Sequence, residues 1–416
     1  MHGSVKTTTG WLVVVASTIA LIVGNGPILL FTFAAFLKPI TDQTGWQRGT
    51  MSLGVALGLT IAGLATPLVG QFIDRWGVRR VTLVAVTLFA ASVAAISLTG
   101  ASVAVFVALY AVAGLVSSGH APLPYSKAIT AWFDSRRGMA LGIAMAGVGI
   151  GTAVMPQVAG LLVKALGWRD AYIGLGLLTW IIAFPAILLF VKEPPLAGKR
   201  LGNSASAAVL GDNVGVALRT KDFWTMAVAV LLIVTAVNGI IAHLVALLTD
   251  RGMPPAVATR MLIGVGLSTI LGRLISGYLL DRVFAPYLAA AIFLVPLAGI
   301  LILWWGGASP ALGLLAAICF GFSLGAEVDV IGFMVGRYFG LRHYGVIYGY
   351  IFAIFTIGSG VGPYLMGLSF DTTHSYATAL IVFCAMLITS SASISRMGAY
   401  RFPGEVTGIA GAERVS

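Results

Sequence analysis

Several ionisable side chains of this sequence stand inside long apolar stretches, where a charge is costly and is usually kept for a function. Arg273 lies eight residues before Asp281, which is about 12 Å along a helix at roughly 1.5 Å per residue. Its guanidinium stays charged and presents a planar fork that fits a carboxylate through two hydrogen bonds. We therefore expect Arg273 to bind an anionic substrate. The alternative is a structural ion pair with Glu327 or Asp329.

Three further residues are candidate contacts for such a substrate. Lys127, seven residues before Asp134, either binds the anion or extends its ammonium group toward solvent. Tyr125 either donates its hydroxyl to a carboxylate or packs in the core. The segment 24–27 reads Gly-Asn-Gly-Pro, which is expected to break the first helix and turn backbone groups toward a cavity. This break makes Asn25 the third candidate.

Two acidic residues are candidates for carrying a proton. Glu327 and Asp329 are two residues apart on a predicted helix, so at most one of them squarely faces a central cavity. Pairing with Arg337 or Arg342 is the alternative to a role in coupling.

His243 and Asp250 are further candidates for proton coupling, near the end of the predicted helix over 224–249. A histidine titrates near neutral pH, although a lone helical histidine also serves as a packing group. Asp250 stands at the helix end, where it either caps the following loop or takes part in coupling.

The elements that hold these residues are predicted to be membrane-spanning helices. The chain has 416 residues, of which 59% are hydrophobic and only 9% charged, whereas a soluble domain is about 25% charged. Lipid must therefore be the solvent for much of the surface. A span needs roughly 20 apolar residues. The predicted spans are 11–37, 49–72, 81–98, 102–133, 139–164, 171–190, 224–249, 256–280, 288–305, 310–336, 346–370 and 376–394.

The distribution of positive charge predicts the orientation of these spans. An even number of spans places both termini on one side, and most of the 25 Lys and Arg residues fall in segments on that side. Positive loops face the cytoplasm, so both termini are expected there. The same rule accounts for the net charge of +11 without nucleic acid as a partner.

Two motifs repeat along the chain with the same displacement of 207 residues, which indicates two homologous halves. The first is Gly70-x3-Asp74-Arg75, repeated as Gly277-x3-Asp281-Arg282. The second is Gly138-x3-Gly142-x13-Pro156-x3-Gly160, repeated as Gly345-x3-Gly349-x13-Pro363-x3-Gly367. The predicted parts are an N-terminal six-helix bundle over 1–191, a cytoplasmic linker over 192–223, a C-terminal six-helix bundle over 224–396 and a cytoplasmic tail over 397–416.

The passage over 70–80, which begins with the first motif, resembles the G-x-x-x-D-R-x-G-R-R signature of the major facilitator superfamily. It contains Gly70, Asp74, Arg75, Gly77, Arg79 and Arg80. Glycine there is expected to let two helices approach closely, Asp74 to cap a helix N-terminus, and the arginines to bond carboxylates such as Asp134. The resemblance implies an all-α fold of twelve spanning helices in two pseudo-symmetric bundles, in which this motif serves structure and gating.

Three further passages resemble the monocarboxylate transporter and oxalate:formate antiporter families. They are Trp132-Phe133-x2-Arg136-Arg137-Gly138-x-Ala140-x-Gly142, His243-Leu244-Val245 with Asp250-Arg251-Gly252, and Gly272-Arg273-x3-Gly277-x3-Asp281-Arg282. The likeness covers essentially the whole chain. It implies symport of a proton and a small monocarboxylate by alternating access, in a bacterial inner membrane and by a monomer.

One departure bears on the substrate. Oxalate antiporters carry a lysine in the middle of the eleventh helix, where this chain has Phe355. The missing cation argues against a dianion and favours a singly charged or partly aromatic acid.

Three other functions are weighed against symport. Exchange of organic anions uses the same coupling residues. Drug efflux is suggested by Gly142-x8-Gly151 in the fifth predicted helix, although small residues there also serve helix packing. A sensor would need an added signalling domain, and the tail after Arg396 is too short for one. The sequence contains no nucleotide-binding loop, no metal-ligand spacing and no nucleophile beside a base, so neither an enzyme nor a cofactor is expected.

Overall fold

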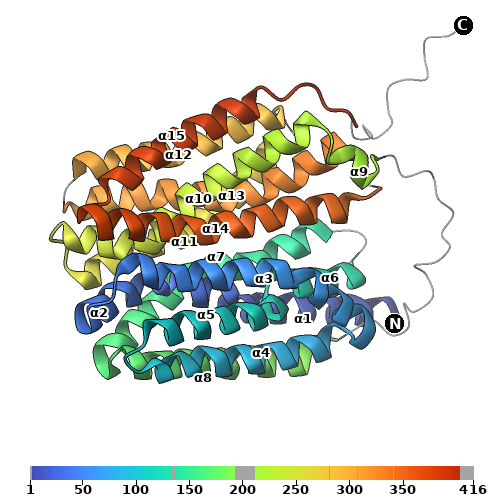
Figure 1. Ribbon diagram of the computed structural model, residues 1–416. Coiled ribbons are helices and arrows are strands. Elements are labelled where there is room, and N and C mark those ends of the chain that lie inside the picture. Colours follow the sequence, from blue (N-terminus) through green and yellow to red (C-terminus); the bar gives the residue numbers. More distant parts are fainter. Residues whose placement is uncertain are drawn as a thin grey trace, which may run out of the picture.

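The computed structural model describes residues 2–133, 137–192, 211–280, 282–306, 308–340 and 342–402 (Figure 1). Within these ranges twelve helical segments are long and apolar enough to cross a membrane, which confirms the number predicted. They are Thr9–Thr44, Arg48–Ile73, Val78–Thr99, Val103–Trp132, Met139–Leu166, Trp168–Phe190, Lys221–Asp250, Pro255–Leu280, Ala285–Gly306, Pro310–Phe339, Tyr344–Thr373 and Ala377–Ser395. The first runs beyond its predicted end at residue 37, because the helix continues through polar residues after the apolar stretch.

Two of the spans consist of three helical pieces each. The first contains α1 (His2–Ile22), a π-helical turn (Gly26–Phe31) and α2 (Phe33–Thr44). The fourth contains α5 (Val103–Ser117), a 3-10 turn (Ser118–His120) and α6 (Pro122–Trp132). The other helices are α3 (Arg48–Trp76), α4 (Val78–Ala95) with a 3-10 turn (Ile96–Thr99), α7 (Arg137–Leu166), α8 (Trp168–Phe190), the short α9 (Val214–Ala217), α10 (Lys221–Asp250), α11 (Pro255–Leu280), α12 (Ala285–Gly306), α13 (Pro310–Phe339), α14 (Tyr344–Thr373) and α15 (Ala377–Ser395).

The two halves of the chain form two bundles with the same arrangement, blue to green and yellow to red in Figure 1. The starts of α3 and α11, α4 and α12, α5 and α13, and α7 and α14 are each displaced by 207 residues. Neighbours correspond as well: α3 packs on α5 as α11 packs on α13, and α1 packs on α7 as α10 packs on α14. The repeat predicted from two short motifs therefore extends to the whole bundle.

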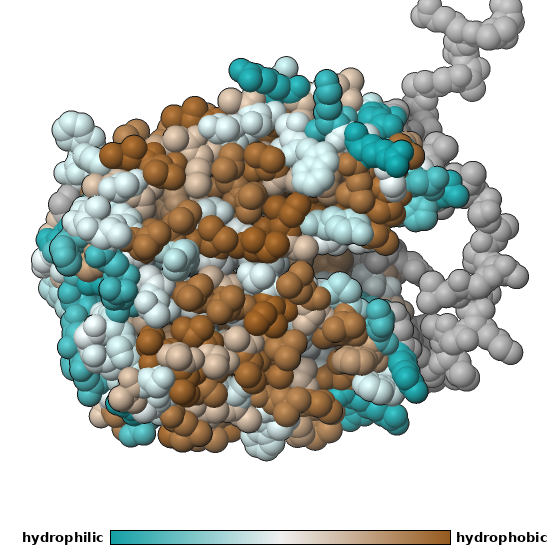
Figure 2. Space-filling model, in the orientation of Figure 1, coloured by the Kyte–Doolittle hydropathy of each residue, from teal (hydrophilic) through white to brown (hydrophobic). Residues whose placement is uncertain are grey.

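The outer surface is apolar between two polar ends, as Figure 2 shows by its brown band between teal margins. On the spanning helices, large apolar side chains such as Leu64, Leu161 and Leu274 are exposed. Such a surface would be costly in water and is stable in hydrocarbon. The chain is therefore an integral membrane protein.

We call one end of the molecule the terminal end and the opposite end the lock end. The terminal end holds the turn between Trp76 and Val78 and the last described residue, Phe402, and both described chain termini lie on its side in Figure 1. The lock end holds the turns before Arg48 and after Asp250.

The bundles meet along two seams of small residues. In the seam between α3 and α14, a Cβ added to Gly367 would lie 2.6 Å from the Cα of Gly49, and one added to Gly63 would lie 2.9 Å from Thr356. Gly70 follows Gly63 by seven residues, on the same face of α3, yet no heavy atom lies within 4 Å of its added Cβ. The two helices are in contact at the lock end and separate toward the terminal end.

The seam between α7 and α11 diverges in the same direction. A Cβ on Gly266 would lie 2.4 Å from the backbone nitrogen of Ala153, whereas Gly142 and Gly277 have no heavy atom within 4 Å of theirs. The close helix approach expected at the motif glycines Gly70 and Gly277 is therefore absent from this state. Its absence has a physical reason, because these glycines lie where the bundles have parted.

Alanine substitutions along α11 test this geometry. Gly266→Ala places a methyl group against the backbone of α7, and overpacking of this kind costs roughly 1–3 kcal/mol. Gly277→Ala meets open space and improves helix propensity by up to about 1 kcal/mol. After a heating step in detergent, size-exclusion chromatography should recover less folded Gly266→Ala than wild type and at least as much Gly277→Ala. Equal behaviour of the two variants would contradict the diverging seam.

Candidate functional site

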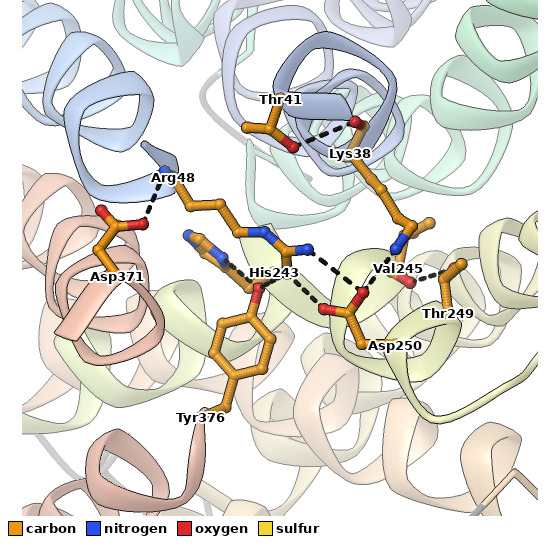
Figure 3. A network of polar contacts seen from close by, with 9 residues as sticks. All are labelled: Lys38, Thr41, Arg48, His243, Val245, Thr249, Asp250, Asp371 and Tyr376. Atoms are coloured by element: carbon orange, nitrogen blue, oxygen red, sulfur yellow. Dashed lines mark hydrogen bonds and ion pairs between the residues drawn. The ribbon is translucent and has the colours of Figure 1, made fainter. Parts of the chain in front are cut away.

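A polar network joins the two bundles at the lock end (Figure 3). Arg48 is the first residue of α3, and its two terminal nitrogens lie 2.5 and 3.2 Å from the carboxylate oxygens of Asp250 at the end of α10. Lys38 of α2 lies 2.6 Å from the same carboxylate. The Arg48 guanidinium also stacks 3.7 Å above the ring of Phe370. We call this network the polar lock; one acid of the C-terminal bundle holds two cations of the N-terminal bundle.

Asp371 of α14 adds a helix cap to the polar lock. Its carboxylate accepts hydrogen bonds from the backbone N–H groups of Arg48 and Gly49, at 2.9 and 2.6 Å. These are the first residues of α3, where unpaired N–H groups and the helix dipole favour an anion. Because cap and helix belong to different bundles, the cap also fastens the lock end.

His243 extends the polar lock into the core. The Tyr376 oxygen lies 2.5 Å from the Arg48 guanidinium, which donates to it, so the Tyr376 proton is free for Nδ1 of His243 at 3.2 Å. Nε2 of His243 then carries the proton and donates to the Ser52 hydroxyl at 2.9 Å. His243 is fully buried, and this chain of bonds suits the neutral imidazole.

Two sequence expectations are revised by this geometry. Asp250 was considered as a cap of the following loop, but its carboxylate instead pairs with Arg48 and Lys38 across the bundles. His243 bonds Ser52 of the other bundle, so it has more than a packing role. Neither residue contacts Arg273 or its acids through a bond that the structure shows.

A second group of charges lies in the C-terminal bundle between α11 and α13. The glycines of these helices allow very close packing, since a Cβ on Gly272 would lie 2.1 Å from the Phe322 carbonyl oxygen. Arg273 is therefore held against α13, where its guanidinium lies 3.5 Å from the Asp329 carboxylate. The Arg273 side chain is 21% exposed and that of Asp329 is 30% exposed. This ion pair is long and only partly exposed.

Glu327 lies beside the same pair but is fully buried. Among the described side chains, both of its carboxylate oxygens lack a hydrogen-bond partner, and so does the Ser323 hydroxyl one helical turn earlier. Arg273 acts on Glu327 electrostatically without bonding it. An ionised carboxylate is very costly without donors in an apolar interior, so the protonated acid fits this arrangement. As expected from their spacing, only Asp329 of the two acids reaches solvent.

The N-terminal bundle holds a neutral network at the corresponding depth. The Tyr125 hydroxyl lies 2.6 Å from Nδ1 of His120, and Nε2 of His120 lies 3.1 Å from the Val23 carbonyl. A carbonyl only accepts, so Nε2 donates to Val23 and Nδ1 accepts from Tyr125. The helix break predicted at 24–27 is present between α1 and the π-helical turn, and Val23 is a carbonyl that it frees.

The four other residues expected at the substrate site have different surroundings in the structure. Tyr125 is fully buried with its hydroxyl on His120, so it is closed to a ligand in this state. The Asn25 side chain accepts from the backbone of Gly26 at 2.8 Å. Lys127 is half-buried on α6, and Phe355 is half-buried on α14.

The signature motif residues lie at the terminal end. Gly77 takes a φ of 84° in the turn between α3 and α4, a conformation that favours glycine. Arg79 donates to the Leu188 carbonyl of α8, and Arg75 lies over the Trp76 ring. Arg80 is exposed, and Arg282 bonds the Tyr278 carbonyl and covers its ring. Asp134, Asp281 and the Asp74 side chain lie outside the described residues.

Sequence reasoning missed the cations and the tyrosine of the polar lock. The predicted spans end at residue 37 and begin again at 49, so they leave Lys38 and Arg48 in a connection, although both lie on helices. A signal was present in the acids at equivalent helix ends, Asp250 and Asp371, which are natural partners for such cations. The partners are more than 200 residues apart in sequence, so no local pattern connects them.

Removing the acid at the centre of the polar lock tests its role. Asp250→Asn leaves Arg48 and Lys38 facing each other without a carboxylate, so the closed lock end should lose stability and the terminal end should close more often. A cysteine pair replacing Gly70 and Gly349, in a background without Cys319 and Cys384, should then cross-link several-fold faster.

Asp212→Asn is the matched control, because it removes an ion pair with Arg401 inside the C-terminal half. It should leave the cross-linking rate unchanged. An Asp250→Asn variant that cross-links like the control would show that the polar lock does not determine which end of the protein is open.

Comparison with known proteins gives one consistent result. Residues 11–363 match the Major Facilitator Superfamily. An uncharacterized MFS-type transporter of Bacillus subtilis, YcxA, is 24% identical over 87% of this chain and 89% of its own length. Monocarboxylate transporter 13 of Bos taurus is 27% identical over 92% of this chain and 88% of its own. A bacterial homolog of the human lysosomal transporter Spinster, solved in an inward-facing and occupied conformation, shares the fold with a TM-score of 0.65 at 15% identity, over 93% of both chains. With its twelve helices in two repeated bundles, the chain belongs to the Major Facilitator Superfamily of membrane transporters.

Proposed function

We propose that the protein carries a small organic monocarboxylate together with a proton across a bacterial inner membrane. The observation that carries this proposal is the group of one cation and two acids: Arg273 with Asp329 at 3.5 Å and the buried, unpartnered Glu327. The similarity to monocarboxylate transporters of Bos taurus and Homo sapiens, at 27% and 24% identity, supports the same substrate class.

The charge of this group links substrate to proton. One guanidinium balances one carboxylate, so with Arg273 paired to Asp329 the second acid, Glu327, is favoured in its protonated form. A substrate carboxylate that binds Arg273 replaces Asp329 as its partner. Asp329 then lowers its energy by taking a proton, because an unpaired charge inside the bundle is costly. One monocarboxylate and one proton enter together and leave the net charge unchanged.

The diverging seams supply the movement. Positive charge on the side of the termini supports a cytoplasmic terminal end, which makes this state inward-facing with the polar lock closed on the outer side. Arg273 and Asp329 are then reached from the cytoplasm. Closing the terminal end and opening the lock would expose the same pair to the outside, which is alternating access with a fixed site.

Drug efflux receives no support from the site. Gly151, which suggested it, packs against the backbone of Ile22, and its counterpart 207 residues later, Gly358, packs against that of Leu231, each within a single bundle. They serve helix packing. The partly exposed guanidinium of Arg273 also suits an anion better than a cationic drug.

A pH gradient tests coupling directly. In proteoliposomes loaded with neutral buffer, uptake of a radiolabelled monocarboxylate such as lactate should accelerate when the outside is made acidic. A proton ionophore should abolish accumulation against the gradient. Uptake that ignores the pH gradient but requires an anion inside the vesicles would instead assign the protein to the anion exchangers.

Substituting each of the two candidate cations by the other basic residue tests which of them binds the substrate carboxylate. Arg273→Lys keeps the charge but loses the planar fork, and a charge-assisted hydrogen bond contributes about 1.5–3 kcal/mol, or roughly tenfold to over a hundredfold in affinity. Lys127→Arg also keeps its charge and should have a much smaller effect. Direct binding to folded, monodisperse protein provides the measurement. Unchanged affinity in Arg273→Lys would remove this residue from the substrate site.

Amide substitutions separate the two acids. Asp329 contacts Arg273 and reaches solvent, whereas Glu327 has no exposed surface through which to exchange a proton in this state. Asp329→Asn should therefore abolish acceleration of uptake by a pH gradient while exchange of labelled for unlabelled substrate continues. Glu327→Gln mimics the protonated acid and should keep the pH response. The reverse pattern would make Glu327 the proton carrier.

A further inference from the structure

A row of four aromatic rings runs along α14 toward the Arg273–Asp329 pair. Tyr344 and Tyr348 stack with centroids 5.7 Å apart and an interplanar angle of 11°. Tyr348 and Phe352 follow at 5.9 Å and 23°, and Phe352 and Phe355 at 5.4 Å and 4°. We call these four residues the aromatic row. Spacings of four, four and three residues place all of them on one face of the helix.

This face looks away from the lipid. Val346 and Tyr350 mark the lipid side of the same helix segment, where they are 50% and 47% exposed. At about 100° per residue, they lie on the far side of α14 from the centre of the aromatic row. The rings of the row are nonetheless half-buried rather than buried. By contrast, the stacked pair of Phe36 and Tyr172, which fills space inside the N-terminal bundle, is fully buried.

The aromatic row adjoins the charged group. The Tyr344 hydroxyl donates to the Gly332 carbonyl of α13 at 3.2 Å, and a Cβ on Gly332 would lie 3.7 Å from the Tyr348 ring. Gly332 follows Asp329 by three residues, so both lie on the same face of α13. A ligand held at Arg273 therefore has aromatic rings for neighbours.

We propose that the preferred substrate is an aryl monocarboxylate, with its carboxylate on Arg273 and its ring against the aromatic row. This inference rests on the proposed function for the carboxylate end. Aligned rings offer π faces and edges to a flat ligand ring, which an aliphatic chain cannot exploit. The row carries no cation, so it discriminates by ring stacking and leaves the single charge to Arg273.

Benzoate and cyclohexanecarboxylate test the inference, because they match in charge and size while only benzoate is aromatic. Hydrophobicity alone favours the saturated ring. Stacking should make benzoate bind about three- to tenfold tighter, the range expected for an aromatic pair. The ratio of the two dissociation constants should fall to about one or below in Phe352→Leu, which removes a ring but keeps an apolar side chain.

Tyr350→Leu is the matched control, since it removes an aromatic ring from the lipid side of the same helix. It should keep the wild-type ratio. Equal binding of the two acids by wild type, or a benzoate preference that survives Phe352→Leu, would overturn the inference and leave monocarboxylate transport standing. If neither acid nor lactate binds the wild type, the proposed function fails and this inference fails with it.

Discussion

A charge inside an apolar bundle needs a partner, and this protein has one guanidinium for two carboxyl groups between α11 and α13. Arg273 is paired to Asp329 at 3.5 Å, while Glu327 is enclosed and, within the described part of the chain, neither of its oxygens has a hydrogen-bond donor. At a surface, water would solvate the unpaired charge, but in the interior an unpaired charge costs much free energy. The proposed coupling follows from this imbalance: a substrate anion on Arg273 would leave Asp329 without its cation, and Asp329 would then take up a proton.

The rest of the fold positions that group and changes its access. Glycine at 272 brings α11 against α13 so that Arg273 meets Asp329. Along the seams between bundles, glycines at the lock end touch the opposite backbone, whereas Gly70 and Gly277 face open space. The polar lock supplies charge attraction and a helix cap at the closed end. A rigid bundle on each side lets a few contacts at one end decide which end is open.

Much of the fold could be predicted from the sequence, because lipid requires each span to be long and apolar, and two motifs recur with the same displacement in both halves. For Arg273 the sequence leaves two interpretations open, anion binding and an ion pair with Glu327 or Asp329. The structure contains the pair with Asp329, and binding of substrate stays a prediction. The polar lock could not be predicted, because Arg48 and Asp250 are distant in sequence and look like ordinary loop charges. Likewise, nothing in the sequence shows that His120 holds the Tyr125 hydroxyl, or that Gly70 faces open space in this state. These features depend on tertiary placement and on the conformational state.

Proton uptake on substrate binding tests the central claim most directly. Purified protein in weakly buffered detergent solution, with a pH indicator, would be mixed with a saturating monocarboxylate near neutral pH. If the substrate displaces Asp329 from Arg273, about one proton should be taken up for each carboxylate bound, and affinity should weaken as pH rises. Binding of the carboxylate without proton uptake, and with an affinity independent of pH, would contradict the shared-cation account.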